Sequence, residues 1–119
     1  MPVRSLDSSV LTWPDRETVE QVLRRWLVQE VGHHPEPVRL GYFGSYARGD
    51  WGVGSDLDLI AIVRDTDTPF ERRALTWDLN ALPIPAELVV YTQKEWEKLM
   101  REHSRFADTL SREAVWVYP

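Results

Sequence analysis

The stretch GSYARGDWGVGSDLDLIAIV, residues 44–63, places a glycine-rich loop directly before two acidic residues and a hydrophobic run. The run of Leu, Ile, Ala and Val over residues 57–63 predicts a buried strand. Residues two apart on a strand share a face, so we expect Asp56 and Asp58 to project to one side, with Cα atoms about 6.5 Å apart. Leu57 and Leu59 then face the other side. The sequence therefore predicts an acidic pair at the start of a strand.

The loop and the acidic pair together indicate a site for a charged ligand. Two carboxylates this close repel, and each raises the pKa of the other unless a cation lies between them; oxygen ligands suit Mg²⁺ or Mn²⁺. Gly44 and Ser45 directly follow a predicted strand over residues 38–43. Glycine lets the backbone approach a bulky anion, and the serine hydroxyl and neighbouring N–H groups can hold phosphate oxygens. A phosphate cradle facing two carboxylates is typical of metal-assisted phosphoryl or nucleotidyl transfer.

Each part alone has a simpler interpretation. Glycine-rich loops are often tight turns, and isolated D-x-D pairs are often solvated or capping acids. The stretch lacks the later oxygen ligands of an EF-hand and the G-K-[ST] of a P-loop. The order of strand, G-S, ten residues, D-x-D and strand is far more specific than either part.

Composition narrows the class of protein. The chain has 119 residues, 43% of them hydrophobic and 28% charged, which predicts one globular domain over residues 1–119 with an N-terminal extension over 1–14. A net charge of −5 without a basic block argues against direct nucleic-acid binding. The absence of cysteine excludes disulfides and thiolate metal sites. No apolar stretch long enough for a membrane span and no signal-peptide pattern is found, so we expect a cytoplasmic protein without a membrane partner.

Helix and strand signals alternate along the chain, which predicts an α/β (α+β) fold, a mixed β-sheet with helices packed on it. Strands are expected over residues 38–43, 57–63 and 87–91, with an edge strand over 114–118. The apolar character of ELVVY, residues 87–91, indicates a central, buried strand. Helices are expected from the start signal Thr12-Trp-Pro-Asp15 to about Gly32, from the capping box Thr68-Pro-Phe-Glu71 to about Leu82, from the capping box Thr92-Gln-Lys-Glu95 to about His103, and briefly from Ser104.

The quoted stretch resembles the signature of the polymerase-beta nucleotidyltransferase superfamily, in which G-S, A-R-G and S-D-x-D-L follow in this order. The small size of the chain and the early position of the motif are similar to those of the minimal nucleotidyltransferases, which are often encoded beside a helical HEPN protein. The resemblance is strongest over residues 38–63. It continues through AELVVYTQKEWEKL and the tail FADTLSREAVWVY, which resembles the E-G-x-x-L-Y ending of the family with Ala114 in place of the glycine. The resemblance implies a polymerase-beta-like nucleotidyltransferase fold.

The resemblance also implies roles for single residues in catalysis and metal binding. Gly44 and Ser45 fall on the phosphate-binding pair of the family, and Asp56 and Asp58 fall on its two metal-binding carboxylates. A third acid is expected from a following strand, where Glu87 is the candidate at a position usually held by aspartate. Glu87 would complete the metal site and take the proton from the nucleophile.

Further loop residues are implied in nucleotide binding. Arg48 and Gly49 match the A-R-G of the family, and two roles stay open for Arg48: reaching a phosphate, or pairing with an acid that pins the loop. Ser55 is also implied among the nucleotide-binding residues, and the role favoured for it is to cap or orient the turn. Trp51 has two open interpretations as well, stacking on a nucleobase or covering the core.

The activity that the resemblance implies is transfer of a nucleoside monophosphate from a nucleoside triphosphate to a hydroxyl, with AMP as the leading candidate. Two Mg²⁺ ions assist the transfer, and pyrophosphate leaves. The resemblance implies a tyrosine of a HEPN toxin as acceptor, which makes this chain an antitoxin. Two alternatives stay open. One is a non-catalytic antitoxin or binding subunit. The other is an antibiotic-modifying nucleotidyltransferase whose pocket is completed by a partner or by a second copy in a homo-oligomer.

Overall fold

A four-stranded sheet forms the centre of the computed structural model, which describes residues 13–34 and 37–119. Its order is β3-β2-β1-β4. The strands are β1 (Pro37–Phe43), β2 (Leu57–Val63), β3 (Ala86–Thr92) and β4 (Val115–Tyr118). β1 runs antiparallel to β2 and to β4, whereas β2 and β3 are parallel. The mixed sheet predicted from the sequence is confirmed, and β4 is the expected edge strand.

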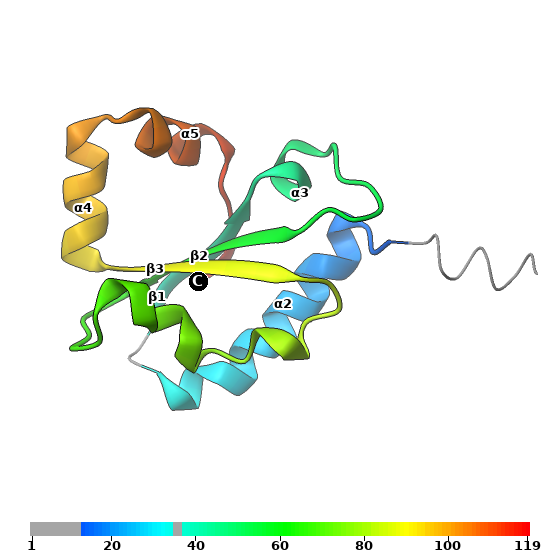
Figure 1. The fold of residues 1–119 in the computed structure, drawn as a ribbon, viewed down its shortest axis with the longest axis horizontal. Helices are drawn as coiled ribbons and strands as arrows, with labels where there is room; N and C mark the ends of the chain where they lie inside the picture. The colour runs from blue at the N-terminus through cyan, green and yellow to red at the C-terminus, as the bar shows by residue number, and fades with distance from the viewer. Residues whose placement is uncertain (1–12, 35–36) are drawn as a thin grey trace, which may run out of the picture.

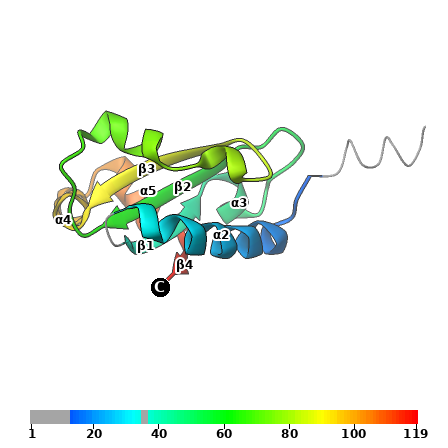
Figure 2. The same ribbon diagram turned by 90° about the horizontal axis from the view of Figure 1, so that it is seen from below.

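Helices cover the sheet from two sides. They are α2 (Arg16–Glu30), α3 (Ser45–Arg48), α4 (Gln93–Glu102) and α5 (Arg105–Glu113), with short 3-10 helices η1 (Val31–His33), η2 (Phe70–Thr76) and η3 (Leu79–Ala81). Figure 1 shows α2 on one side of the strands and α4 with α5 on the other. Figure 2 shows η2 and η3 running along β3. In the described part of the chain, no helix is long and apolar enough to cross a membrane.

The core lies between α2 and one face of the sheet. The apolar stripe of α2 packs on alternate strand residues, and the buried set includes Val19, Leu23, Trp26, Leu27, Leu40, Leu59 and Ala61. Because side chains alternate along a strand, Ile60 and Ile62 point to the opposite face, on which α4 packs. Asp58 shares that second face. The side of the sheet away from α2 therefore carries the acidic residue of interest.

The start of α2 differs from the prediction. The helix begins at Arg16, and Asp15 is its N-cap, whose carboxylate accepts a hydrogen bond of 2.9 Å from the Thr18 N–H. Pro14 therefore precedes the cap instead of standing in the first turn. Asp15 wins this position because its side-chain oxygen satisfies an N–H group that the helix leaves unpaired.

The predicted N-terminal extension, residues 1–14, lies outside the described residues except for its last two. Trp13 donates from its indole N–H to the Ser55 carbonyl over 3.2 Å. The Tyr46 hydroxyl donates to the Pro14 carbonyl over 2.8 Å. Both contacts attach this segment to the loop between β1 and β2.

The helix predicted from Thr68 to about Leu82 is wrong. The segment forms η2 and η3, and η2 has no side-chain cap. The break falls at Trp77, whose backbone is extended (φ −100°, ψ 140°) and whose ring stacks on His34 with centroids 3.9 Å apart. Arg73, which is 9% exposed, donates to the carbonyls of Thr68 and Val90. These tertiary contacts outweigh the local capping signal.

The position predicted for ELVVY is also wrong. This segment belongs to β3, which is an edge strand of the sheet. Only Val90 and Thr92 of β3 are buried, and Glu87 is exposed. The apolar residues are needed because η2 and α4 pack on this strand, with Tyr91 contacting the rings of Phe70 and Trp96. Because η2 and α4 cover β3, its residues are apolar even though the strand lies at the edge of the sheet.

Candidate active site

Asp58 stands where three strands meet at one end of the sheet. It lies opposite Phe43, the last residue of β1, and beside Glu87, near the start of β3. Because β2 and β3 are parallel and in register here, the Cα atoms of Asp58 and Glu87 are about 5 Å apart. Asp56 comes directly before β2. The structure thus brings the three predicted acids to the same end of the sheet.

The surroundings of Asp58 disfavour its charge. Its side chain is half-buried, and this burial raises the pKa of the carboxyl; the negative charges of Glu87 and Asp56 raise the pKa further, and the charge of Arg48 offsets part of the effect. Asp56 and Glu87 are both exposed. A cation between these groups would stabilise the charged form of Asp58. Among residues 13–34 and 37–119, no three acidic or histidine side chains converge closely enough to hold a metal ion. At least one of the three acids therefore has to change its side-chain position before all three can share one ion.

Gly44 and Ser45 form the corner between β1 and α3. Gly44 has φ +78°, a conformation that favours glycine, and without a side chain it leaves room for the Asp58 carboxylate. Ser45 is half-buried and is the first residue of α3. Within the described residues, its hydroxyl has no hydrogen-bond partner. The Ser45 hydroxyl is therefore free to donate and to accept, one residue after the glycine that contacts Asp58.

Gly49 and Ser55 shape the loop in this structure. Gly49 has φ +86° and ends α3, with its N–H donating to the Ser45 carbonyl over 3.0 Å. The Ser55 hydroxyl accepts from the Gly52 N–H over 2.8 Å, and the Ser55 N–H donates back to the Gly52 carbonyl over 3.0 Å. This pair of hydrogen bonds fits the turn-orienting role favoured for Ser55.

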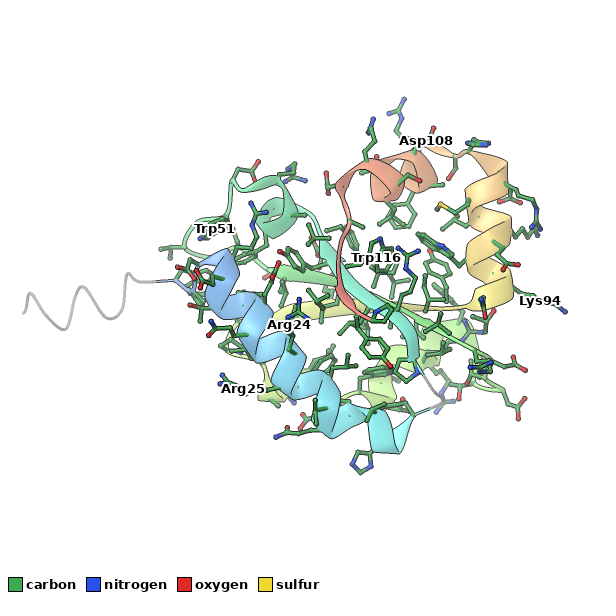
Figure 3. All side chains as sticks on the ribbon, turned by 180° about the vertical axis from the view of Figure 1, so that it is seen from behind. Arg24, Arg25, Trp51, Lys94, Asp108 and Trp116 are labelled. Carbon is green, nitrogen blue, oxygen red and sulfur yellow. The ribbon has the colours of Figure 1, made fainter. Side chains whose placement is uncertain are left out.

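Trp51 stacks on Tyr46, with ring centroids 5.3 Å apart and the planes within 7° of parallel. Figure 3 shows it on the loop near the start of α2. Tyr46 is fully buried, and Trp51 packs against the hydrophobic core. Of the two interpretations of Trp51, the structure favours the cover of the core.

Arg48 pairs with two acids. Its Nε lies 3.2 Å from Asp50 Oδ2, and its Nη1 lies 3.5 Å from Glu113 Oε2. The side chain is 51% exposed, so these pairs contribute little to stability. The structure thus contains the pinning role considered for Arg48, whose charge also offsets part of the rise in the pKa of Asp58.

Glu113 contacts the candidate site, and the sequence reasoning gave it no role there. As the last residue of α5, it accepts a hydrogen bond of 2.7 Å from the Gly44 N–H on its Oε1. The pairing of Tyr42 with Val115 explains the contact, because the same antiparallel register continued by two residues sets Glu113 beside Gly44. Figure 1 shows the end of α5 near the junction of β1 and α3. The resemblance of the tail to E-G-x-x-L-Y marked this acid, but not the strand that it would lie against.

A separate cavity of about 560 Å³ lies at the other end of β2 and is lined by residues that include His33, His34, Asp65, Asp67, Arg73 and Trp77. Two of its charged or ionisable side chains, His34 and Arg73, have structural partners. His34 Nε2 lies 2.9 Å from Glu30 Oε1, and Arg73 Nη1 lies 2.6 Å from Glu95 Oε1. At the Asp58 end, the side chains of Asp58 and Ser45 form no such hydrogen bond or ion pair within the described residues, which makes this end the candidate site.

Comparison with known proteins decides the family. The sequence model of the nucleotidyltransferase domain family matches residues 22–115. The chain belongs to the nucleotidyltransferase domain family. The matched span contains β1, β2 and β3, the Gly44–Ser45 corner, and the acids Asp56, Asp58, Glu87 and Glu113.

Two solved structures share the fold of this nucleotidyltransferase domain. One is a candidate nucleotidyltransferase from Sulfolobus solfataricus, with 14% identity, a TM-score of 0.58 and coverage of 85% of this chain and 80% of that one. The other is a toxin-antitoxin structure with AMP-PNP, with 22% identity, a TM-score of 0.58 and coverage of 83% and 72%. A search of curated proteins found no match. The expected nucleotidyltransferase fold is confirmed.

Proposed function

We propose that this nucleotidyltransferase domain transfers a nucleoside monophosphate from a metal-bound nucleoside triphosphate to a hydroxyl of a partner protein. AMP is the leading candidate for the transferred group. The observation that carries the proposal is the position of Asp58. It lies between Glu87 and the Gly44–Ser45 corner, in a member of a nucleotidyltransferase family. Both the carboxylates and the phosphate-binding groups are thus supplied by adjacent strand ends.

The carboxylates fit a divalent cation, because hard oxygen ligands are those that Mg²⁺ and Mn²⁺ prefer. In this proposal Asp56 and Asp58 hold two such ions, and Glu87 completes the site. When bound, the ions neutralise the charge that develops on the triphosphate and activate the attacking hydroxyl. In this proposal Glu87, which is exposed beside Asp58, takes the proton of that hydroxyl.

The loop residues hold the nucleotide in this proposal. The Gly44 N–H and the Ser45 hydroxyl donate to phosphate oxygens, and Arg48 adds a positive charge at the mouth of the site. Gly49 and Ser55 act at one remove, by ending α3 and by fixing the turn at Gly52. None of these contacts reads the base, so several nucleoside triphosphates should compete for the site.

The acceptor is proposed to be a tyrosine of a helical HEPN-type toxin, with this chain as its antitoxin. The structural likeness to a toxin-antitoxin assembly with AMP-PNP supports a nucleotide and a toxin as partners. The acidic residues stand at an open end of the sheet, with Asp56 and Glu87 exposed to an incoming side chain.

One observation favours a second candidate, a non-catalytic antitoxin. The Glu113 carboxylate takes the Gly44 N–H that a phosphate oxygen would use. A protein that neutralises its toxin by covering it has no use for an open phosphate site. The two candidates differ in one outcome, the transfer of a label.

The test is incubation of the chain, Mg²⁺ and the protein encoded beside it with ATP labelled at the α- or the γ-phosphate. Transfer of a nucleoside monophosphate predicts label on the partner from α-labelled ATP only. Asp58→Asn should abolish the label, whereas Asp65→Asn, a matched change beyond the other end of β2, should not. A stable complex that carries no label would favour the non-catalytic antitoxin.

A further inference from the structure

Glu113 occupies a position suited to an anion. Its Oε1 accepts from the Gly44 N–H over 2.7 Å, and both of its oxygens lie 3.5 Å from Arg48 Nη1. The side chain is only 16% exposed. A carboxylate and a phosphate oxygen are both anionic acceptors that prefer such charged or backbone donors. The two donors are the ones assigned above to the triphosphate.

Space for a larger anion lies next to this carboxylate. A hollow of about 280 Å³ is lined by Ala47, Arg48, Arg112 and Glu113. Two of the four lining residues are arginines and one is the acid Glu113, so the lining keeps a net positive charge that attracts anions. A phosphate group entering here meets Arg48 and the Glu113 carboxylate, which accepts the hydrogen bond from the Gly44 N–H.

We propose that Glu113 is an internal competitor for the phosphate position, so that polyphosphate binds by displacing its carboxylate from Gly44 and Arg48. The inference rests on the proposed nucleotide site and names the residue that controls entry to it. One N–H group cannot give a full hydrogen bond to both acceptors, and two anions at one donor repel. Glu113 therefore sets the affinity of the site.

Displacement needs only a rotation of the side chain. The backbone around Glu113 is held by the end of α5, where the Ala114 N–H donates to the Leu110 carbonyl over 3.0 Å, and by β4, which begins at Val115. The Glu113 carboxylate can therefore leave Gly44 while α5 and β4 keep their places. The residue acts as a movable group on a fixed support.

A purely structural role for Glu113 makes a different prediction. If its carboxylate only ties α5 to the corner at Gly44, its removal loosens that corner and weakens any ligand held there. If it is a competitor, its removal strengthens the binding of anions. The sign of the change in affinity separates the two roles.

The test is titration calorimetry of the full chain with inorganic tripolyphosphate, with and without Mg²⁺, on wild type, Glu113→Ala and Glu113→Gln. Loss of one charge-assisted hydrogen bond predicts tighter binding to Glu113→Ala by about tenfold to a hundredfold. Glu113→Gln keeps the acceptor without the charge and should fall between. Asp108→Asn is the matched control on α5, since its side chain is exposed and points outward in Figure 3. It should bind as wild type does.

The amide resonance of Gly44 gives a second readout that needs no enzyme activity. It should move in Glu113→Ala without ligand, and in wild type when tripolyphosphate is added. Unchanged or weaker binding in both Glu113 variants would overturn the inference, even if nucleotide transfer proceeds normally. Tighter tripolyphosphate binding without any nucleotide transfer would leave the inference standing and contradict the proposed activity.

Discussion

Gly44 lies so close to Asp58 that a methyl group on Gly44 would overlap the Asp58 carboxylate. The contact joins the backbone corner that follows β1 to the acidic side chain of β2. Gly44 also holds φ +78°, which a residue with a side chain rarely adopts. Two independent demands thus fall on one glycine: the conformation of the corner and the room for the carboxylate.

Gly44→Ala should therefore lower both stability and nucleotide binding. The strained backbone should cost about 1–3 kcal/mol in the free energy of unfolding, as measured by urea denaturation. The overlap falls on the movable end of Asp58, so it should displace that carboxylate without unfolding the chain. Gly52→Ala is the control, because a Cβ atom there meets nothing within 4 Å. Equal stability of Gly44→Ala and wild type would contradict this account of the corner.

Asp58→Asn should raise the stability of the metal-free protein at neutral pH. Burial and the charges of Glu87 and Asp56 raise the pKa of Asp58 above its ordinary value of 3.8, so the folded state binds the proton more tightly than the unfolded state. The free energy of unfolding of wild type should then fall as pH rises from below 3.8 through the raised pKa. Asparagine carries no charge and escapes this loss.

Thermal melts of both proteins from pH 3 to pH 7.5, without metal, measure this difference. The advantage of Asp58→Asn should appear as pH rises through the raised pKa and remain above it. Asp65→Asn serves as the control for removal of an acid from a loop. An advantage that is largest at the lowest pH would show that the sign of the Asp58 effect is wrong.

Glu95→Gln should destabilise the protein at neutral pH. The hydrogen bond from Arg73 lowers the pKa of Glu95 below its ordinary value of 4.5, with a further contribution from the Thr92 N–H. Its stabilisation is therefore present above pH 4.5 and is lost as pH falls through the lowered pKa. Glu95 is 42% exposed, so we expect a loss of about 1 kcal/mol after solvent screening.

Urea denaturation at pH 7 and at pH 3 checks the Glu95 prediction. The difference between Glu95→Gln and wild type should shrink at the lower pH. Glu97→Gln, which removes an exposed acid from the same helix, should change little at either pH. A pH-independent difference would place the role of Glu95 in the capping of α4 and not in its pairing with Arg73.

Glu87→Gln should separate binding from transfer. Asp56 and Asp58 remain to hold the metal and triphosphate, so the affinity for a magnesium-bound nucleotide should stay nearly unchanged. Loss of the general base should slow transfer by roughly 10²-fold or more. Glu87→Asp should retain more activity than Glu87→Gln, since it keeps the charge. Full activity of Glu87→Gln would leave the site with two acids and no identified base.

Local signals predicted the parts of the fold that depend on nearby residues. The hydrophobic run over residues 57–63 predicts a strand, and β2 spans Leu57–Val63. The box Thr92-Gln-Lys-Glu95 predicts a capped helix, and both of its hydrogen bonds form, at 3.2 and 2.9 Å. In each case the stabilising contact lies within a few residues of the signal.

Features of the fold that depend on residues distant in the sequence were predicted wrongly or not at all. The capping box at Thr68 does not begin an α-helix, because Trp77 packs against His34, the residue that follows η1. The edge position of β3 follows from the strand order and not from its own apolar residues. Glu113 reaches Gly44 only because β4 pairs with β1. No pattern within residues 105–113 specifies that neighbour.

Crystals of the chain with Mn²⁺ and a non-hydrolysable ATP analogue, measured by anomalous diffraction, test the central claim most directly. The account predicts manganese on the carboxylates of Asp56 and Asp58, phosphates on Gly44 and Ser45, and Glu113 turned away from Gly44. Manganese or nucleotide bound instead in the 560 Å³ cavity lined by His33, Asp65 and Trp77, with the Asp58 end empty, would contradict it.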